Sequence, residues 1–184
     1  MKRALTSKLL PLAAAMAIAA TIGAPASANE RDRQFFNSIE GSWSGGGEIV
    51  AGKYKGTKFN CTFEGSTPTQ KLGMALDGGC RVGIFSQKMS ASVLSAGKKN
   101  YKGQFMDGAA GSGLDITGGN VVDARKVVFS IHRNDLHGVM QARLASRDTM
   151  NVTISVRVDD SMVPVIGMSL KRVDNTAVGA IARK

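Results

Sequence analysis

The sequence is poor in aromatic residues, and it lacks motifs that mark common enzymes. Aromatic side chains make up 5% of the chain, with a single tryptophan. The G-x-S-x-G motif of the α/β-hydrolases is missing. Acidic residues fall mostly at expected turns, such as Asp159-Asp160, so no pair of carboxylates flanking a cleft can be identified. We therefore expect that the protein is not an enzyme.

Cysteine is scarce as well, since Cys61 and Cys80 are the only two. They do not form a C-x-x-C motif and no histidine lies near them in the sequence, which disfavours a redox or metal pair. An even number of cysteines in an exported chain is typical of a disulfide. We predict a Cys61–Cys80 bond, which stabilises by about 3 kcal/mol in the chain-entropy account.

The first 28 residues have the pattern of a signal peptide. Three basic residues precede an apolar, alanine-rich run over 9–22, and Ala24–Ala28 offers the small residues that a signal peptidase recognises. The apolar run is too short for an uncleaved anchor, and no cysteine follows it that could carry a lipid. We expect cleavage after Ala28, a single domain over 29–184, and a periplasmic or secreted location.

Basic residues outnumber acidic ones in the expected mature chain. The leader holds three of the 24 Lys and Arg residues, which leaves 21 against 14 acidic residues and a net charge of +7. Such a protein could contact anionic envelope lipids or acidic glycans. The basic residues are scattered along the sequence, which also fits ordinary solubility. No basic stripe with interleaved aromatic residues is present, so a nucleic-acid partner is not expected.

From residue 41 onward, apolar and polar residues alternate with the period of two that is typical of β-strands. Before it, Arg31–Ile39 predicts a short helix with Phe35, Phe36 and Ile39 on one face, capping the end of a barrel. No heptad, helical stripe or internal repeat competes with the strands. We expect strands over 41–50, 53–64, 71–85, 87–96, 101–106, 126–132, 136–144, 151–158 and 164–173.

Short turns between these strands predict an all-β protein, a single antiparallel up-and-down β-barrel of eight to ten strands with a short N-terminal helix. The glycine-rich segment Asp107–Asn120 is expected to be a long loop or an irregular strand. Both cysteines fall on apolar strand faces, and a reversal around Ser66–Gln70 would bring them together. The two faces comprise Phe59, Cys61 and Phe63 in one strand, and Leu72, Met74, Leu76, Cys80, Val82 and Ile84 in the next.

The same alternation fits a soluble barrel, with the apolar face inside, or an outer-membrane barrel, with that face toward lipid. Aromatic residues are too sparse for two interfacial girdles. Arg172 lies on the apolar face of the last strand, where contact with lipid near the midplane would cost ~2–4 kcal/mol. The chain also ends in Ala182-Arg-Lys184 rather than in an aromatic residue. We expect a barrel that does not span the membrane.

The stretch Gly41-Ser-Trp43 after a Phe-rich helix resembles the G-x-W signature of lipocalins and other calycins. This resemblance implies that a basic side chain near the last strand packs across Trp43, with Arg172 the first candidate and Lys171 the alternative.

The longer Gly-x-Trp-x-Gly-x-Gly pattern is also similar to nitrobindin-type haem barrels, which carry a histidine ligand near the C-terminus. His137 lies two strands before the end, so no cofactor is expected. Small periplasmic protease inhibitors share a tryptophan-bearing first strand and one disulfide, with a different cysteine placement.

The only histidine cluster is His132-Arg-Asn-Asp-Leu-His137. If Asn134-Asp135 is a two-residue turn, His132 faces His137 across the two strands. The pair could then hold a transition metal, with Asp135 or water completing the coordination shell. An exposed hairpin tip is the alternative, because Asn and Asp favour turns for their own reasons.

These observations predict an exported, non-catalytic barrel that holds a small apolar or amphipathic ligand or contacts an envelope lipid or glycan. The alternative is an envelope-structural or protease-inhibitor-like protein that acts through its outer surface and loops. Seven methionines follow the leader, and they fit either an adaptable binding surface or ordinary core filling. The sequence leaves open the oligomeric state and whether the interior is hollow, because the inward positions include small residues: Gly45, Gly47, Gly78, Ala91 and Ala142.

Overall fold

The computed structural model describes residues 28–97, 100–106 and 113–173. They form one helix and ten strands. In chain order these are α1 (Ala28–Asn37), β1 (Gly41–Ile49), β2 (Lys58–Ser66), β3 (Gly73–Val82), β4 (Phe85–Ser95), β5 (Tyr101–Met106), β6 (Leu114–Asp123), β7 (Lys126–Arg133), β8 (Leu136–Leu144), β9 (Thr149–Val158) and β10 (Ser161–Arg172).

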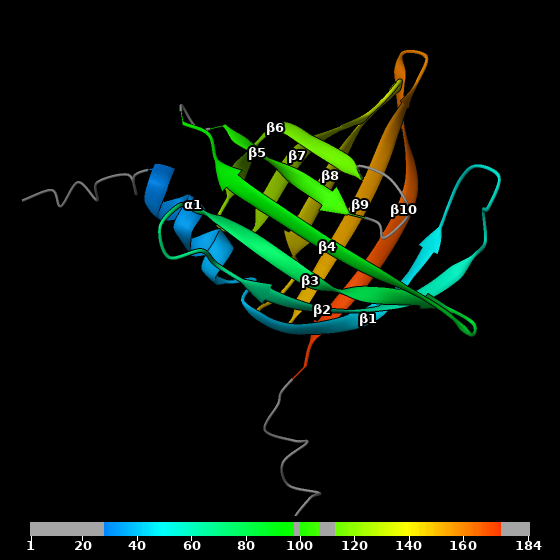
Figure 1. Ribbon diagram of the computed structural model, residues 1–184, viewed down its shortest axis with the longest axis horizontal. Coiled ribbons are helices and arrows are strands. Elements are labelled where there is room, and N and C mark those ends of the chain that lie inside the picture. The colour runs from blue at the N-terminus through cyan, green and yellow to red at the C-terminus, as the bar shows by residue number, and fades with distance from the viewer. Residues whose placement is uncertain (1–27, 98–99, 107–112, 174–184) are drawn as a thin grey trace, which may run out of the picture.

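The ten strands form one closed antiparallel barrel. Each strand pairs with its neighbours in the sequence, and β1 pairs with β10 to complete the ring. The predicted up-and-down barrel is therefore confirmed, with ten strands. Figure 1 shows α1 at one end, which we call the base. At the opposite end, which we call the mouth, lie the β1–β2, β3–β4, β7–β8 and β9–β10 connections.

The apolar side chains of alternate residues point into the barrel, as the period of two predicts. On β2, Phe59, Cys61 and Phe63 are more buried than the residues between them. The same alternation holds on β7, where Val127, Phe129 and Ile131 are buried. These inward residues form one hydrophobic core with the side chains of α1.

The helix closes the base of the barrel, as expected. Phe35, Phe36 and Ile39 are at most 1% exposed, and the rings of Phe36 and Tyr101 meet edge to face with 5.3 Å between their centres. The helix begins at Ala28, the expected cleavage point, and the rest of the predicted leader lies outside the described residues. Within the part of the chain that the structure describes, no helix is long and apolar enough to cross a membrane.

Several strand boundaries differ from the prediction, and two of them differ because turns interrupt the alternation. Residues 51–56 form bends and turns, so β2 begins at Lys58 rather than at Lys53. Gly83 adopts a φ of +57°, and β3 ends at Val82 rather than continuing to Phe85. The inward position predicted for Ile84 is wrong, since this side chain is 91% exposed in the turn. An apolar residue in a turn continues the period of two without belonging to the strand.

Part of the glycine-rich segment is a strand rather than a loop. β6 covers its second half, and the β6–β7 register shifts between Ile116 and Gly118 and again between Val121 and Asp123. Such shifts mark β-bulges. The irregular strand is thus the alternative that the structure supports over 114–120, and residues 107–112 lie outside the described residues.

Candidate binding cavity

Trp43 and Arg172 lie together at the base of the barrel. They are direct register partners between β1 and β10, and the guanidinium carbon of Arg172 lies 4.3 Å from the centre of the indole ring. Trp43 is fully buried, and its Nε1 donates a hydrogen bond to the carbonyl of Ile39 at 2.9 Å. The alternative candidate, Lys171, is exposed on the outer face.

Arg172 also ties the last strand to the connection between α1 and β1. Its guanidinium donates hydrogen bonds to the backbone carbonyls of Ser38, at 2.8 Å, and of Glu40. Its Nε lies 3.8 Å from a carboxylate oxygen of Asp148. Because one side chain satisfies these groups and covers the indole, the base is closed by polar contacts outside and by aromatic packing inside.

A buried polar pair that the sequence did not reveal joins the helix to β5. Asp32 is 3% exposed and accepts a hydrogen bond from the Tyr101 hydroxyl at 2.6 Å. It also pairs with Arg31 at 3.0 Å. Burial raises the pKa of Tyr101 well above its usual range, and the hydrogen bond to Asp32 raises it further. The two residues are 69 positions apart, so no local pattern could have paired them.

The barrel encloses an apolar cavity of about 70 Å³. Phe35 and Ile39 of the base form its floor, and strands around the barrel supply its wall. Ser90 is the one polar residue in the lining, and no described lining residue is ionisable. The full lining comprises Phe35, Ile39, Phe63, Met74, Leu76, Met89, Ser90, Ala91, Val93, Phe105, Ile116, Val127, Phe129, Met140, Ala142, Met150, Val152, Ile154, Met168 and Leu170.

Methionines make up an unusual share of this wall. Five of the seven that follow the predicted leader line the cavity: Met74, Met89, Met140, Met150 and Met168. The thioether chain is unbranched and polarisable, so methionine adapts to irregular spaces more readily than leucine or isoleucine. The cavity wall can therefore change shape at small cost.

The interior becomes more accessible toward the mouth. Core side chains of the base are fully buried, whereas Phe59, Met89 and Met168 are only partly buried although they point inward. The ring of Phe59 lies over β1, where a Cβ on Gly47 would come within 2.4 Å of it. The interior is therefore less tightly covered at the mouth than at the base.

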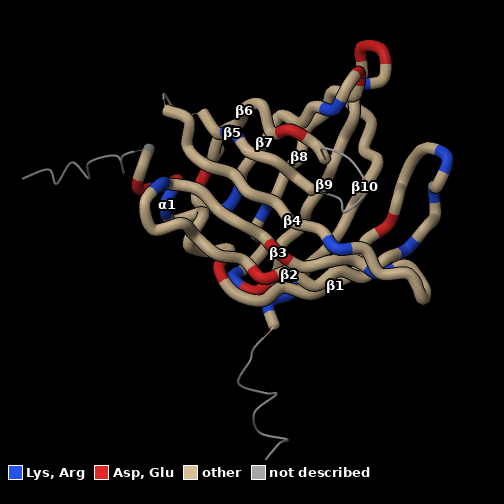
Figure 2. The backbone as a smooth tube through the Cα atoms, viewed as in Figure 1, with Lys and Arg blue, Asp and Glu red and all other residues tan. Residues whose placement is uncertain are grey.

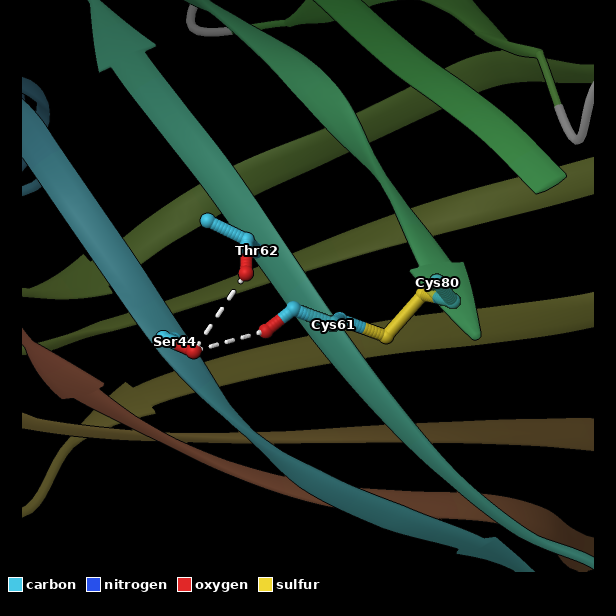
Figure 3. The surroundings of a disulfide bond; sticks show 4 residues. All are labelled: Ser44, Cys61, Thr62 and Cys80. Atoms are coloured by element: carbon cyan, nitrogen blue, oxygen red, sulfur yellow. Dashed lines mark hydrogen bonds between the residues drawn. A yellow bond between two sulfur atoms is a disulfide. The ribbon is translucent and has the colours of Figure 1, made fainter. Parts of the chain in front are cut away.

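The predicted disulfide is confirmed, and it lies on the mouth side of β2 and β3. Cys61 and Cys80 are direct register partners and are bonded to each other. Figure 3 shows the bond crossing from β2 to β3, with the Ser44 hydroxyl donating to the carbonyl of Cys61 at 3.2 Å. A disulfide belongs to a non-reducing compartment.

The structure brings the two histidines together but adds no third ligand. The β7–β8 register pairs His132 with His137, as the two-residue turn predicts, and their Nδ1 atoms are 3.2 Å apart. Asp135 does not join them, and the described residues contain no cluster of three or more His, Cys, Asp or Glu side chains arranged to hold a metal ion. What the geometry provides is a pair of neighbouring imidazoles near a hairpin tip, tilted by 48° with 4.5 Å between their ring centres.

Comparison with models of known protein families found no match, and comparison with curated proteins found none either. The resemblance to lipocalins and other calycins therefore remains one of architecture. The closed antiparallel barrel is compatible with that class.

Proposed function

We propose that this protein is a non-catalytic binding protein of the periplasm, or a secreted one, that holds a small apolar group inside its barrel. The apolar cavity carries this proposal. With one serine in its lining, it offers almost nothing to hydrogen-bond a polar ligand, so the buried part of a ligand must be hydrocarbon. The polar end of an amphipathic ligand would remain at the mouth.

The size of the cavity limits the ligand. Sites for drug-sized molecules are usually about 300–1,000 Å³, whereas this cavity measures about 70 Å³. It fits the end of an alkyl chain or a small ring, and the methionine wall lets it expand around a longer chain. The lack of an ionisable side chain in the described lining supports a binding role, because acid–base and most nucleophilic mechanisms need such a group at the substrate.

Native mass spectrometry of the exported chain, beginning at Asn29, tests this proposal. We expect a fraction with added mass that is lost on denaturation, and we expect the remaining protein to take up a medium-chain fatty acid. Ala142→Leu places a branched hydrocarbon in the cavity and should abolish uptake. Ala145→Leu is the matched control, because Ala145 is exposed on the β8–β9 connection. A clean apo mass with no uptake would overturn the proposal.

The second candidate is an envelope-structural or protease-inhibitor-like role through the outer surface and loops. The observation in its favour is the position of the exposed large hydrophobic residues. Eight of the eleven lie on the connections at the mouth or next to them: Val50, Tyr54, Val82, Ile84, Phe85, Leu136, Val158 and Met162. The same mass measurement separates the candidates, since a surface-acting barrel would bind nothing inside.

A further inference from the structure

The β3–β4 hairpin separates from its neighbouring strands at its end. β2 pairs with β3 only as far as Asn60 and Arg81, and within the described residues β4 pairs with β5 only from Ser90 onward. The strands β3 and β4 pair with each other up to Val82 and Phe85. The end of this hairpin is therefore a two-stranded ribbon, which Figure 1 shows diverging from the β1–β2 hairpin.

The tip of this ribbon is apolar and exposed. Ile84 is 91% exposed, Phe85 is 74% exposed and Val82 is 42% exposed. Only Gly83 separates Val82 from Ile84 and Phe85 in the sequence, so the three side chains form one apolar patch at the convex tip of the hairpin. Large apolar side chains gathered on an exposed surface usually mark an interaction site.

Basic side chains lie on the ribbon behind this tip and on the neighbouring β1–β2 hairpin. Lys58 begins β2, Arg81 and Lys88 lie on the ribbon, and Lys53 and Lys55 lie on the β1–β2 connection beside Tyr54, which is 64% exposed. All five basic residues are exposed, and none forms an ion pair within the described residues. Figure 2 shows the basic residues of the β1–β2 connection at the mouth.

Acidic residues are nearly excluded from these two hairpins. The sequence has no Asp or Glu from Ile49 to Phe63 or from Gly78 to Met106. Glu48 lies opposite Lys58 in the β1–β2 register, so the two hairpins together keep a net positive charge. The other tips of the mouth carry Asp159-Asp160, on the β9–β10 hairpin, and Asp135, on the β7–β8 hairpin. In the strand order the β1–β2 hairpin separates β9–β10 from β3–β4.

We propose that the tip of the β3–β4 hairpin, with the β1–β2 connection beside it, docks into the surface of a bilayer that contains anionic lipid. A bilayer deforms around a convex apolar tip, whereas a protein partner would need a matching pocket. Arg81 lies three positions before Ile84 with a turn between them, so their Cα atoms are at most about 10 Å apart. That spacing matches an apolar insertion of roughly 5–10 Å with cations at the headgroups. Tyr54 suits the same interface.

This inference goes beyond the proposed function and does not depend on it, since an empty barrel could still dock. It would place the mouth against lipid, tilted so that the acidic β9–β10 tip lies away from the anionic surface. The disulfide ties the ribbon to β2 just behind the inserted part.

Co-sedimentation with vesicles of phosphatidylglycerol and phosphatidylethanolamine tests the proposal, with phosphatidylcholine vesicles as the uncharged comparison. The variant Lys53→Gln/Lys55→Gln/Arg81→Gln should bind the anionic vesicles about 100-fold more weakly, at ~1 kcal/mol per basic residue. The control Lys102→Gln/Arg143→Gln/Lys171→Gln removes three exposed cations near the base and should stay within about twofold.

The apolar tip is tested separately. Ile84→Ser/Phe85→Ser should weaken anionic vesicle binding at least about tenfold, whereas Val122→Ser, at a residue that is 44% exposed on β6, should not. In Ile84→Trp, the added indole should shift its emission to the blue on vesicles and be quenched by lipids brominated in the acyl chain. Trp43 is fully buried and provides a constant background.

Three results would overturn the proposal. The first is that the wild-type chain fails to bind anionic vesicles. The second is that the control Lys102→Gln/Arg143→Gln/Lys171→Gln loses as much affinity as Lys53→Gln/Lys55→Gln/Arg81→Gln. The third is that the charge variant loses binding while Ile84→Ser/Phe85→Ser binds normally, which would identify a surface for an acidic glycan or protein instead. The cavity variant Ala142→Leu should still bind vesicles, and Ile84→Ser/Phe85→Ser should still take up fatty acid, so the two proposals fail independently.

Discussion

At the scale of single residues, Arg172 connects the last strand to the chain between α1 and β1. It covers the indole of Trp43, and it satisfies backbone carbonyls between α1 and β1. The resemblance to calycins suggested the partnership between the two side chains. It did not indicate the carbonyl partners, because these depend on how the chain enters the first strand.

Replacing Arg172 with Met should lower the free energy of unfolding by about 2–4 kcal/mol, because the cation–π contact is lost and the carbonyls of Ser38, Glu40 and Arg147 lose a donor. The matched control is Lys171→Met, which removes an exposed cation from the adjacent position and should change stability by less than about 0.5 kcal/mol. Urea unfolding monitored by Trp43 fluorescence measures both. Equal losses in the two variants would show that Arg172 does not close the base.

Tyr101 should make the free energy of unfolding fall as the pH becomes alkaline. Its pKa in the folded chain lies above the ordinary 10.0, so above that pH the unfolded chain releases the proton while the folded chain retains it. The contribution is complete below about pH 10 and is lost as the pH rises further. Tyr101→Phe should therefore flatten the fall in unfolding free energy above pH 10, after an initial loss of about 1–3 kcal/mol at neutral pH from the Asp32 contact.

The control for this titration is Tyr54→Phe, the same substitution at the one other tyrosine, which is exposed. Unfolding free energies measured in urea between pH 8 and pH 11.5 (a range chosen around the ordinary value) compare the three chains. If Tyr101→Phe loses stability with rising pH as steeply as the wild-type chain, Tyr101 is not the group responsible.

At the scale of elements, the glycines of β1 have different roles depending on the face they occupy. A Cβ on the inward Gly45 would lie 2.0 Å from the backbone oxygen of Ser169, whereas a Cβ on the outward Gly46 would meet nothing closer than 3.4 Å. β1 and β10 therefore approach each other too closely for a side chain at position 45. Gly45 reflects this close approach rather than empty space in the barrel.

Gly45→Ala should destabilise the protein by about 2–4 kcal/mol, because backbone atoms of β10 must move to admit the methyl group. Gly46→Ala should change stability by no more than about 1 kcal/mol. Thermal unfolding of the two variants side by side gives the comparison. Similar transition temperatures would mean that β10 moves away freely and that the close approach does not hold the barrel closed.

The sequence predicted the strands well where polar residues mark their ends, and poorly where they do not. Asn134-Asp135 indicated its turn and therefore the pairing of His132 with His137, which the register confirms. The turn after Val82 contains apolar residues, so the alternation passed through it and placed Ile84 inside. The burial of Asp32 against Tyr101 and the size of the cavity depend on contacts between distant segments, which a local pattern cannot supply.

At the scale of the whole molecule, the barrel has two different ends. The base is closed by α1, Trp43 and Arg172, and the mouth carries partly exposed core residues and apolar hairpin tips. The apolar cavity lies between them, and we expect its ligand to enter from the mouth. A closed base with an adaptable wall is the arrangement on which the proposed binding function depends.

The most direct test is NMR of the chain from Asn29 to Lys184, labelled with [¹³C-methyl]methionine and titrated with a medium-chain fatty acid. Five methionine methyl groups line the cavity, while Met106 and Met162 lie outside its lining and serve as internal controls. We predict that the signals of Met74, Met89, Met140, Met150 and Met168 shift together and saturate while the two controls stay in place. Shifts confined to Met162 at the mouth, or no shifts at all, would contradict a ligand inside the barrel.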